Sequence, residues 1–273
     1  MIIINADDFG RSVAETNAAA SLFQRRRVTS FSAMVFMADS ERAADLARDL
    51  DSDVGLHLNF CEPWTNGNRV PKSIRAHQDS LVTFFNSNRY AFLMYNPKLR
   101  RSFEAVYHAE VDEFVRLYGR PPSRFDGHRH LHLCANMLID GLIPSGSIVR
   151  RNFTFGPGEK GLLNRAYRWL VDAYLLRRNY ALSDYFFSLE QCLNGRGRSL
   201  NLVAELAKGA SVEVMTHPKN VDEFTYLSGE GYVDSLGSAQ RGTYSELPVK
   251  ARFSIEYPML WSVLASLWEC ALI

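Results

Sequence analysis

The sequence predicts an α/β fold, a single (β/α) barrel of the TIM type formed by residues 1–273. Strand-like and helix-like patterns alternate through the first half of the chain, and polar side chains follow directly after several of the apolar strand patterns. The alternation is typical of βαβ units and of a parallel sheet, and 273 residues is a common length for one such barrel. The sequence contains no internal repeat and no low-complexity tract. We therefore expect one domain.

The first strand and the first helix follow one another directly. Residues 2–4 form a β-branched run, typical of a strand buried on both faces, and the run stops at the polar segment that begins with Asn5. Ser12 and Glu15 have the spacing of a capping box and predict a helix that continues to Arg27.

The next elements repeat this order. Residues 28–36 predict a second strand, and apolar residues at 43, 46, 47 and 50 mark one face of a short helix that begins at Asp39 or Ser40. Residues 54–58 predict a third strand. A polar stretch, residues 62–80, follows it and is long for a connection, so we expect a functional loop there.

The middle of the chain continues the alternation less regularly. An apolar face over residues 103–118 predicts a helix that ends at Gly119, ahead of two prolines, and residues 123–132 predict a fourth strand. Residues 162–176 predict a helix, and the region 153–198 is interpreted as a helical insertion over the barrel mouth. Residues 200–208 then predict a helix and residues 211–216 a strand.

Composition excludes several classes of protein. The 31 Lys and Arg residues nearly balance the 30 Asp and Glu residues, which does not favour nucleic acid or anionic lipid as a partner. The four cysteines form no CxxC pair and are expected to be reduced thiols of a cytoplasmic protein. The amino terminus lacks the basic region of a signal peptide. Residues 259–273 are apolar but too few to span a bilayer, so we expect no transmembrane segment but a packed terminal helix, with an interface as the alternative.

Residues that bind metals or move protons lie at the ends of four of the predicted strands. They are Asp7 and Asp8, His57, His128, and His217. The carboxyl ends of all strands open on one face of a parallel barrel, so these side chains are expected to converge. Each alone has a structural explanation, because adjacent acids often cap a helix and a lone histidine at a strand end is usually structural. Their convergence predicts a site.

A histidine triplet gives a sharper prediction. His128, His130 and His132 alternate along the predicted fourth strand and would share one face, and imidazole is a common metal ligand. One strand cannot supply a complete set of ligands, so other strands must contribute. The sequence has no GxGxxG, P-loop, HExxH or GxSxG motif, which argues against nucleotide chemistry, a zincin protease and a serine hydrolase.

Five motifs, in order along the chain, resemble those of the YdjC-like carbohydrate deacetylases, a family that includes chitooligosaccharide deacetylases and a hopanoid-pathway deacetylase. They are NADDFG at 5–10, VTS at 28–30, GLHL at 55–58, DGHRHLH at 126–132 and EVMTHP at 213–218. The resemblance covers about residues 1–220. Family members often have a proline shortly after the triplet, where this chain has Cys134, Ala135 and Asn136. Residues 153–198 and the last fifty residues match no family motif, which leaves the substrate open.

The resemblance implies a barrel related to polysaccharide deacetylases, with one divalent metal ion held by an aspartate and two histidines. By position, the ligands would be Asp8, His57 and His128, the general base Asp7 and the general acid His217. The positions that would support the ligands or contact substrate are Asp126, His130 and His132. Zinc or magnesium is expected, with manganese, iron or cobalt as alternatives.

The expected reaction is hydrolytic removal of an N-acetyl group from an acetylated amino sugar or oligosaccharide, with release of acetate. The alternatives are a metal-dependent phosphoesterase or other amidohydrolase, and a catalytically silent sugar-binding protein, because a fold does not determine its chemistry. Trp64 would either stack on a sugar ring or anchor its loop. The expected partner is a small-molecule or oligosaccharide substrate, and the oligomeric state stays open, a homodimer included.

Overall fold

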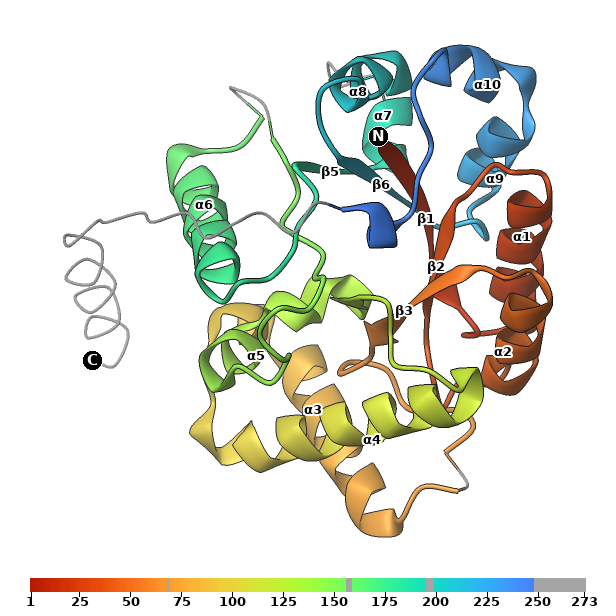
Figure 1. The fold of residues 1–273 in the computed structure, drawn as a ribbon. Helices are drawn as coiled ribbons and strands as arrows, with labels where there is room; N and C mark the ends of the chain where they lie inside the picture. The colour runs from red at the N-terminus through yellow and green to blue at the C-terminus, as the bar shows by residue number, and fades with distance from the viewer. Residues whose placement is uncertain (68, 156–158, 195–198, 248–273) are drawn as a thin grey trace.

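A computed structural model describes residues 1–67, 69–155, 159–194 and 199–247 of the chain. Their strands form one six-stranded sheet in the order β4-β3-β2-β1-β6-β5, and each neighbouring pair is parallel (Figure 1). The strands are β1 (Ile2–Phe9), β2 (Ser30–Ala33), β3 (Asp53–Leu58), β4 (Phe125–Gly127), β5 (Tyr185–Ser188) and β6 (Val212–Thr216). Because the strands are parallel, all their carboxyl ends lie at the same edge of the sheet.

The sheet curls, and the chain at 147–154 links its two edge strands. The backbone N–H of Phe125 in β4 donates to the carbonyl of Ile148 at 2.9 Å, and the N–H of Thr154 donates to the carbonyl of Phe186 in β5 at 2.8 Å. The predicted alternating, parallel α/β fold is thus confirmed. The described residues contain a curled six-stranded sheet and not a closed barrel of eight strands.

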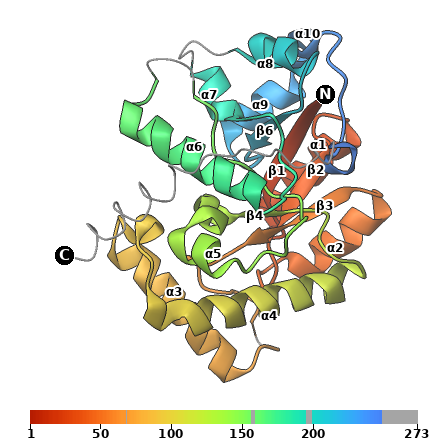
Figure 2. The same cartoon turned by 60° about the vertical axis from the view of Figure 1, so that its left-hand side comes forward.

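Helices surround the outside of the sheet (Figures 1 and 2). They are α1 (Val13–Gln24), α2 (Ser40–Asp49), α3 (Lys72–Ser87), α4 (Arg100–Tyr118), α5 (Ala135–Asp140), α6 (Leu162–Arg177), α7 (Leu189–Leu193), α8 (Leu200–Ala207), α9 (Val221–Ser228) and α10 (Glu230–Leu236), with 3-10 turns η1 (Ala91–Leu93), η2 (Pro97–Leu99), η3 (His128–Leu133) and η4 (Tyr244–Glu246). Helix α6 packs on α5, where the Tyr174 hydroxyl donates to the carbonyl of Leu138.

The two faces of the sheet differ in chemistry. Between the sheet and the helices the core is apolar, and Phe9 stacks on Phe31 with ring centroids 4.2 Å apart. Inside the curl many of the buried side chains are polar or charged; among them are Asn5, Arg124, Asp126, Arg150 and Glu213. A buried charge is costly unless it is paired, so these residues must hold one another in fixed positions. The site at the edge of the curled sheet therefore lies above a layer of buried, charged side chains.

Most predicted elements are confirmed. The strands predicted at 2–4, 28–36, 54–58 and 211–216 correspond to β1, β2, β3 and β6, and the helices predicted from 39 or 40, at 103–118, at 162–176 and at 200–208 correspond to α2, α4, α6 and α8. Gly119 ends α4 with φ of 67°, a left-handed conformation that glycine adopts without a steric penalty.

The predicted functional loop at 62–80 is wrong in its second half, where α3 begins at Lys72. Helix α3 buries Gln78, Leu81 and Phe85 on one face. The polar Gln78 occupies a core position, so the apolar pattern typical of a helix is incomplete in the sequence. The helix was therefore not predicted. Trp64, in the remaining loop, donates from Nε1 to Glu110 at 3.0 Å and packs on Phe36. The loop-anchor alternative is therefore confirmed for Trp64.

The predicted strand at 123–132 is also too long. Strand β4 ends at Gly127, and the histidine triplet lies in η3. Arg129 and His130 have φ of 54° and 59°, so the chain turns sharply directly after His128. The prediction that alternate histidines share one strand face is therefore wrong, because left-handed residues end the alternation.

Two smaller predictions are corrected. The region 153–198 contains α6, as expected for a helical insertion, but it also supplies β5, which pairs with β6 and belongs to the sheet. Ser12 and Glu15 do not form a capping box, since the Ser12 hydroxyl donates to the Glu15 carboxylate and caps no backbone N–H. The predicted terminal helix at 259–273 lies outside the described residues.

Candidate active site

Asp7 and Asp8 lie at the carboxyl end of β1, where the strand loses its regular pairing. The register with β2 shifts between Ala6 and Phe9, and Asp8 has φ of 62°. Side chains of adjacent residues in a regular strand point to opposite faces, so this irregularity is what allows both carboxylates to face one cavity. Aspartate is one of the residues that tolerate the left-handed conformation, which explains the residue type at position 8.

Asp8, His57 and His128 form a cluster at this edge of the sheet. Oδ1 of Asp8 lies 2.9 Å from Nδ1 of His128 and 3.5 Å from Nε2 of His57. One donor atom from each residue lies within 4.8 Å of the other two. The residues come from β1, from β3 and from the start of η3, so the parallel sheet joins positions that are far apart in the sequence.

Asp126 fixes the orientation of the His57 ring. Its Oδ1 lies 2.8 Å from Nδ1 of His57. Burial opposes ionisation of Asp126, but Arg150 and His57 outweigh it and hold the pKa of Asp126 well below its usual range. An ionised carboxylate only accepts hydrogen bonds, so Nδ1 of His57 donates and Nε2 is the nitrogen that faces Asp8. This is the arrangement in which an outer carboxylate orients a metal-binding imidazole.

Asp7 is held by an arginine that the sequence did not single out. Nη1 and Nη2 of Arg150 donate to the two carboxylate oxygens of Asp7, each at 2.7 Å. Asn5 donates to the same carboxylate at 2.6 Å. Burial raises the pKa of Asp7, but the Arg150 guanidinium outweighs it and the net pKa is lowered. Asp7 is therefore ionised at neutral pH and fixed in orientation.

Arg150 itself is surrounded by acids. Its Nε lies 2.6 Å from Oε1 of Glu213, and its Nη2 lies 3.1 Å from Oδ2 of Asp126. The backbone carbonyl of Arg150 lies 3.0 Å from Nε2 of His132. His132 thus supports the arginine that holds Asp7.

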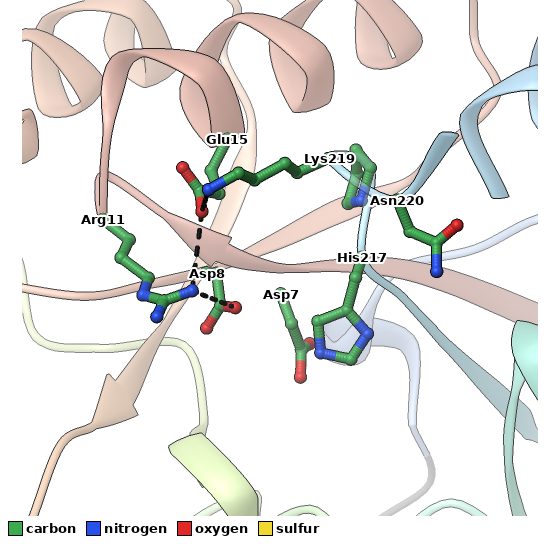
Figure 3. A pocket seen from close by; sticks show the side chains of 8 residues that line it. Asp7, Asp8, Arg11, Glu15, His217, Lys219 and Asn220 are labelled. Atoms are coloured by element: carbon green, nitrogen blue, oxygen red, sulfur yellow. Dashed lines mark hydrogen bonds and ion pairs between the residues drawn. The ribbon is translucent and has the colours of Figure 1, made fainter. Parts of the chain in front are cut away.

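The cavity above these residues opens beside β1 and β6. It has a volume of about 300 Å³, and its lining residues are Asp7, Asp8, Arg11, Glu15, His217, Pro218, Lys219 and Asn220 (Figure 3). Nζ of Lys219 pairs with Glu15 at 2.8 Å, which ties the segment after β6 to α1. The His217 side chain is 41% exposed, and its backbone N–H donates to the buried Glu223 at 2.8 Å. The structure thus brings Asp7, Asp8 and His217 to one cavity.

His130 lies away from the cluster. Its ring packs against Phe153 and Phe186, with centroids 4.6 and 5.8 Å away. Burial holds the pKa of His130 well below its usual range, and burial also lowers the pKa of His132 to about 4. Both rings are therefore neutral at pH 7. Of the triplet, only His128 joins the candidate metal-binding groups among the described residues.

The donor set of Asp8, His57 and His128 fits a divalent metal ion, because mixed carboxylate and imidazole ligation is used by zinc and related ions. The electrostatics of the site also favour a bound cation. Burial opposes a proton on His57, but Asp126 and Asp7 raise the pKa of His57 to about 10. A position that stabilises positive charge on a buried imidazole also favours a cation, whose binding would displace that proton.

A second group of close donors is a poorer fit for a metal. It consists of Asp7, His57 and Asp126. The guanidinium of Arg150 already contacts both of its carboxylates, so positive charge is in place there.

A comparison with protein families identifies the chain. The model of the family described as YdjC-like protein matches residues 1–241. The chain belongs to this family. The family resemblance of the sequence motifs is thereby confirmed.

Relatives of the YdjC-like chain carry related names. A chitooligosaccharide deacetylase of Klebsiella pneumoniae is 29% identical over 247 residues, which cover 85% of this chain and 86% of that protein. A carbohydrate deacetylase of Mus musculus is 31% identical over 173 residues, 59% of this chain and 52% of that protein. A carbohydrate deacetylase of Danio rerio is 26% identical over 133 residues, 48% of this chain and 42% of that protein.

A solved structure shares the fold. A protein of Enterococcus faecalis V583, provisionally named a cellobiose-phosphate cleavage protein, has a TM-score of 0.57 and 18% identity, and the match covers 89% of this chain and 97% of that one. In the described part of the YdjC-like chain, no helix combines the length and the apolar character that a bilayer crossing requires.

Sequence reasoning missed several residues of the site. They are Arg11, Glu62, Arg150, Glu213 and Glu223. Arg11, Arg150 and Glu223 lie in no local pattern that distinguishes them from ordinary surface residues. Glu62 lies in the stretch predicted as a functional loop, and Glu213 begins the EVMTHP motif, but neither was assigned a role. An acid inside an apolar strand pattern, as at Glu213, was a signal that could have been used, since a buried acid requires a partner.

Proposed function

We propose that this protein is a hydrolase that uses one divalent metal ion to remove the acetyl group from an N-acetylated amino sugar or oligosaccharide. The observation that supports this most directly is the Asp8, His57 and His128 donor set, flanked by Asp7 and His217. Family membership and the names of the relatives support carbohydrate deacetylation. The curled parallel sheet is, in this proposal, a variant of the (β/α) barrel.

In the proposal Asp8, His57 and His128 hold the metal, and Asp126 keeps Nε2 of His57 directed at it. Zinc or magnesium is proposed, with manganese, iron or cobalt as alternatives. The ion would supply Lewis-acid polarisation of the acetamide carbonyl and of the attacking water.

Asp7 is the proposed general base. Its carboxylate accepts a proton from the attacking water as the bond to the acetyl carbon forms. Arg150 and Asn5 fix both the charge and the direction of this carboxylate. Because the base is fixed before substrate arrives, little reorganisation is needed during the reaction.

His217 is the proposed general acid. It lies at the end of β6, in the same cavity as Asp7. Its ring would protonate the leaving amine as the C–N bond breaks, so that acetate and the free amino sugar separate. Removal and delivery of a proton are opposed tasks, which explains why the cavity presents two groups.

The cavity suits a sugar. Its volume of about 300 Å³ is at the lower end of the range for ligand pockets, and Arg11, Lys219 and Asn220 place polar groups around it. Such groups match the hydroxyls of one sugar unit, and the open side of the cavity would accept further units.

Product analysis on a substrate panel tests the reaction class. Metal-loaded protein is incubated with N-acetylglucosamine oligomers, lipid-linked N-acetyl amino sugars and sugar phosphates, and acetate and phosphate are both measured. The proposal predicts acetate from an N-acetylated substrate and no phosphate. Phosphate release would establish the phosphoesterase alternative. Saturable sugar binding without any product would establish the silent binding protein.

A further inference from the structure

Glu62 contacts His128, the proposed histidine ligand whose outer nitrogen has no fully buried carboxylate beside it. We infer that Glu62 is a positioning residue for His128: its carboxylate holds the proton on Nε2, so that Nδ1 offers its lone pair beside Asp8. This inference rests on the proposed metal site and adds a residue that no family motif identified.

The geometry of the His128 ring carries the inference. Nδ1 lies 2.9 Å from Oδ1 of Asp8, inside the cluster, and Nε2 lies 3.2 Å from Oε1 of Glu62, outside it. A neutral imidazole carries one proton, and the nitrogen without it is the one that binds a metal. A carboxylate beside Nε2 selects the tautomer in which Nδ1 is the ligand.

The two histidines of the cluster then have opposite tautomers. His57 has Asp126 beside Nδ1 and turns Nε2 inward, whereas His128 has Glu62 beside Nε2 and turns Nδ1 inward. Each ring therefore has a carboxylate on its outer nitrogen. Such partners raise the basicity of a ligand and fix its ring.

Glu62 is itself held in place from two directions. Nε and Nη2 of Arg11 donate to its two oxygens at 2.9 and 2.7 Å, a two-point pair that sets the plane of the carboxylate. Its backbone N–H donates to Oδ1 of Asn59 at 2.9 Å, and its carbonyl accepts from Nε2 of Gln78 at 2.8 Å. Arg11 and Glu62 are only partly buried, yet the carboxylate has one fixed direction.

Arg11 also connects the pair to the other side of the cluster. Its Nη1 lies 3.6 Å from Oδ2 of Asp8. The Arg11 and Glu62 pair therefore joins the loops after β1 and β3 around two of the three proposed ligands.

Metal affinity, measured without substrate, tests the inference. Metal-free wild type, Glu62→Ala and Glu62→Gln are titrated with Co²⁺, and binding is followed by the visible absorption of the complex. Loss of such an outer partner typically weakens a site about 10- to 100-fold, and we expect a weakening of that size for Glu62→Ala. Glu62→Gln keeps the size but loses the charge, so it too should bind Co²⁺ more weakly than wild type.

Glu113→Ala is the matched control. Glu113 makes the same two-point pair, with Arg116 on α4, an element that carries none of the three ligands. Thermal unfolding of each metal-free variant separates positioning from folding, because a merely structural Glu62 would lower the unfolding midpoint and leave the affinity of the folded protein unchanged. If Glu62→Ala does not fold, the Co²⁺ affinity of Glu62→Gln tests the inference instead.

The outcomes are distinct. Weaker Co²⁺ binding by the Glu62 variants, with wild-type affinity in Glu113→Ala, supports the inference. Wild-type affinity in either folded Glu62 variant overturns it and leaves the proposed function standing. A wild-type protein that binds no Co²⁺ overturns the proposed metal site itself.

Discussion

Nδ1 of His57 lies 2.8 Å from Oδ1 of Asp126, and both residues are buried. The pair belongs to neighbouring strands, since His57 in β3 is in register with Asp126 in β4. One hydrogen bond across the sheet therefore decides which nitrogen of His57 faces Asp8.

Asp126→Asn is predicted to weaken metal binding. The asparagine amide can present N–H to Nδ1, which moves the imidazole proton to Nε2, the nitrogen required as a ligand. We expect the dissociation constant for Zn²⁺ to rise about 10- to 100-fold, measured by competition with a chromophoric chelator. Unchanged affinity in a folded Asp126→Asn protein would show that this hydrogen bond does not control the ligand.

Asp7→Asn is predicted to remove activity and to retain the metal. The amide cannot accept the proton of the attacking water, and general-base contributions are typically 10²- to 10⁴-fold, so turnover should fall by about that factor. Acetate release and metal content are measured on the same preparation. A protein that lost its metal but kept a normal rate per bound ion would reverse the roles given to Asp7 and Asp8.

His217→Asn is predicted to have an effect that depends on the leaving group. Amine expulsion needs a proton, so deacetylation of an N-acetyl sugar should fall about 100-fold or more. Hydrolysis of 4-nitrophenyl acetate needs no such proton, because nitrophenolate leaves unaided, and should change far less. Equal losses on both substrates would argue that His217 binds substrate and is not the acid.

Glu110 is predicted to make stability depend on pH. It is fully buried, accepts hydrogen bonds from the Asn59 backbone and from Trp64, and burial raises its pKa from 4.5 to about 8. Between about pH 5 and pH 8 the folded state holds a proton that the unfolded state has released, so its contribution to stability is lost as pH rises through the folded pKa.

Urea unfolding at pH 5 and pH 9 checks this dependence. Glu110→Gln does not titrate, so the wild type should lose stability relative to Glu110→Gln between these values, by a few kcal/mol, since a tenfold change in proton affinity corresponds to about 1.4 kcal/mol. Glu113→Gln, on the same helix, serves as the control and should follow the wild type. Parallel pH dependence of wild type and Glu110→Gln would refute the assignment.

Much of the fold could be predicted because it depends on local patterns. The apolar runs of β1, β3 and β6 and the periodic faces of α2 and α4 are visible in the sequence. Helix α3 was not predicted because one of its buried positions is the polar Gln78. Strand β5 was not predicted because Tyr185–Ser188 is only four residues long and no clear turn pattern marks its ends. Both depend on tertiary packing that no local pattern records.

The site could be predicted only where a residue lies at the carboxyl end of a strand. Parallel topology brings Asp7, Asp8, His57 and His128 to one edge, which follows from strand order alone. Arg150 could not be found this way, because its role depends on the acids that surround it in space. The histidine triplet was wrongly predicted to lie on a strand, because the left-handed residues Arg129 and His130 are not glycines and the sequence gives no sign of a turn there.

In the proposed mechanism, one divalent ion in the Asp8, His57 and His128 cluster supports acetate release. The most direct test adds increasing amounts of Zn²⁺ to chelator-stripped protein and measures acetate released from an N-acetylglucosamine oligomer. We expect no release without metal, and a rate that rises with added metal and stops rising at about one ion per chain, the number that a single three-ligand site holds. Acetate release by fully stripped protein, at the rate of the reloaded protein, would contradict this mechanism.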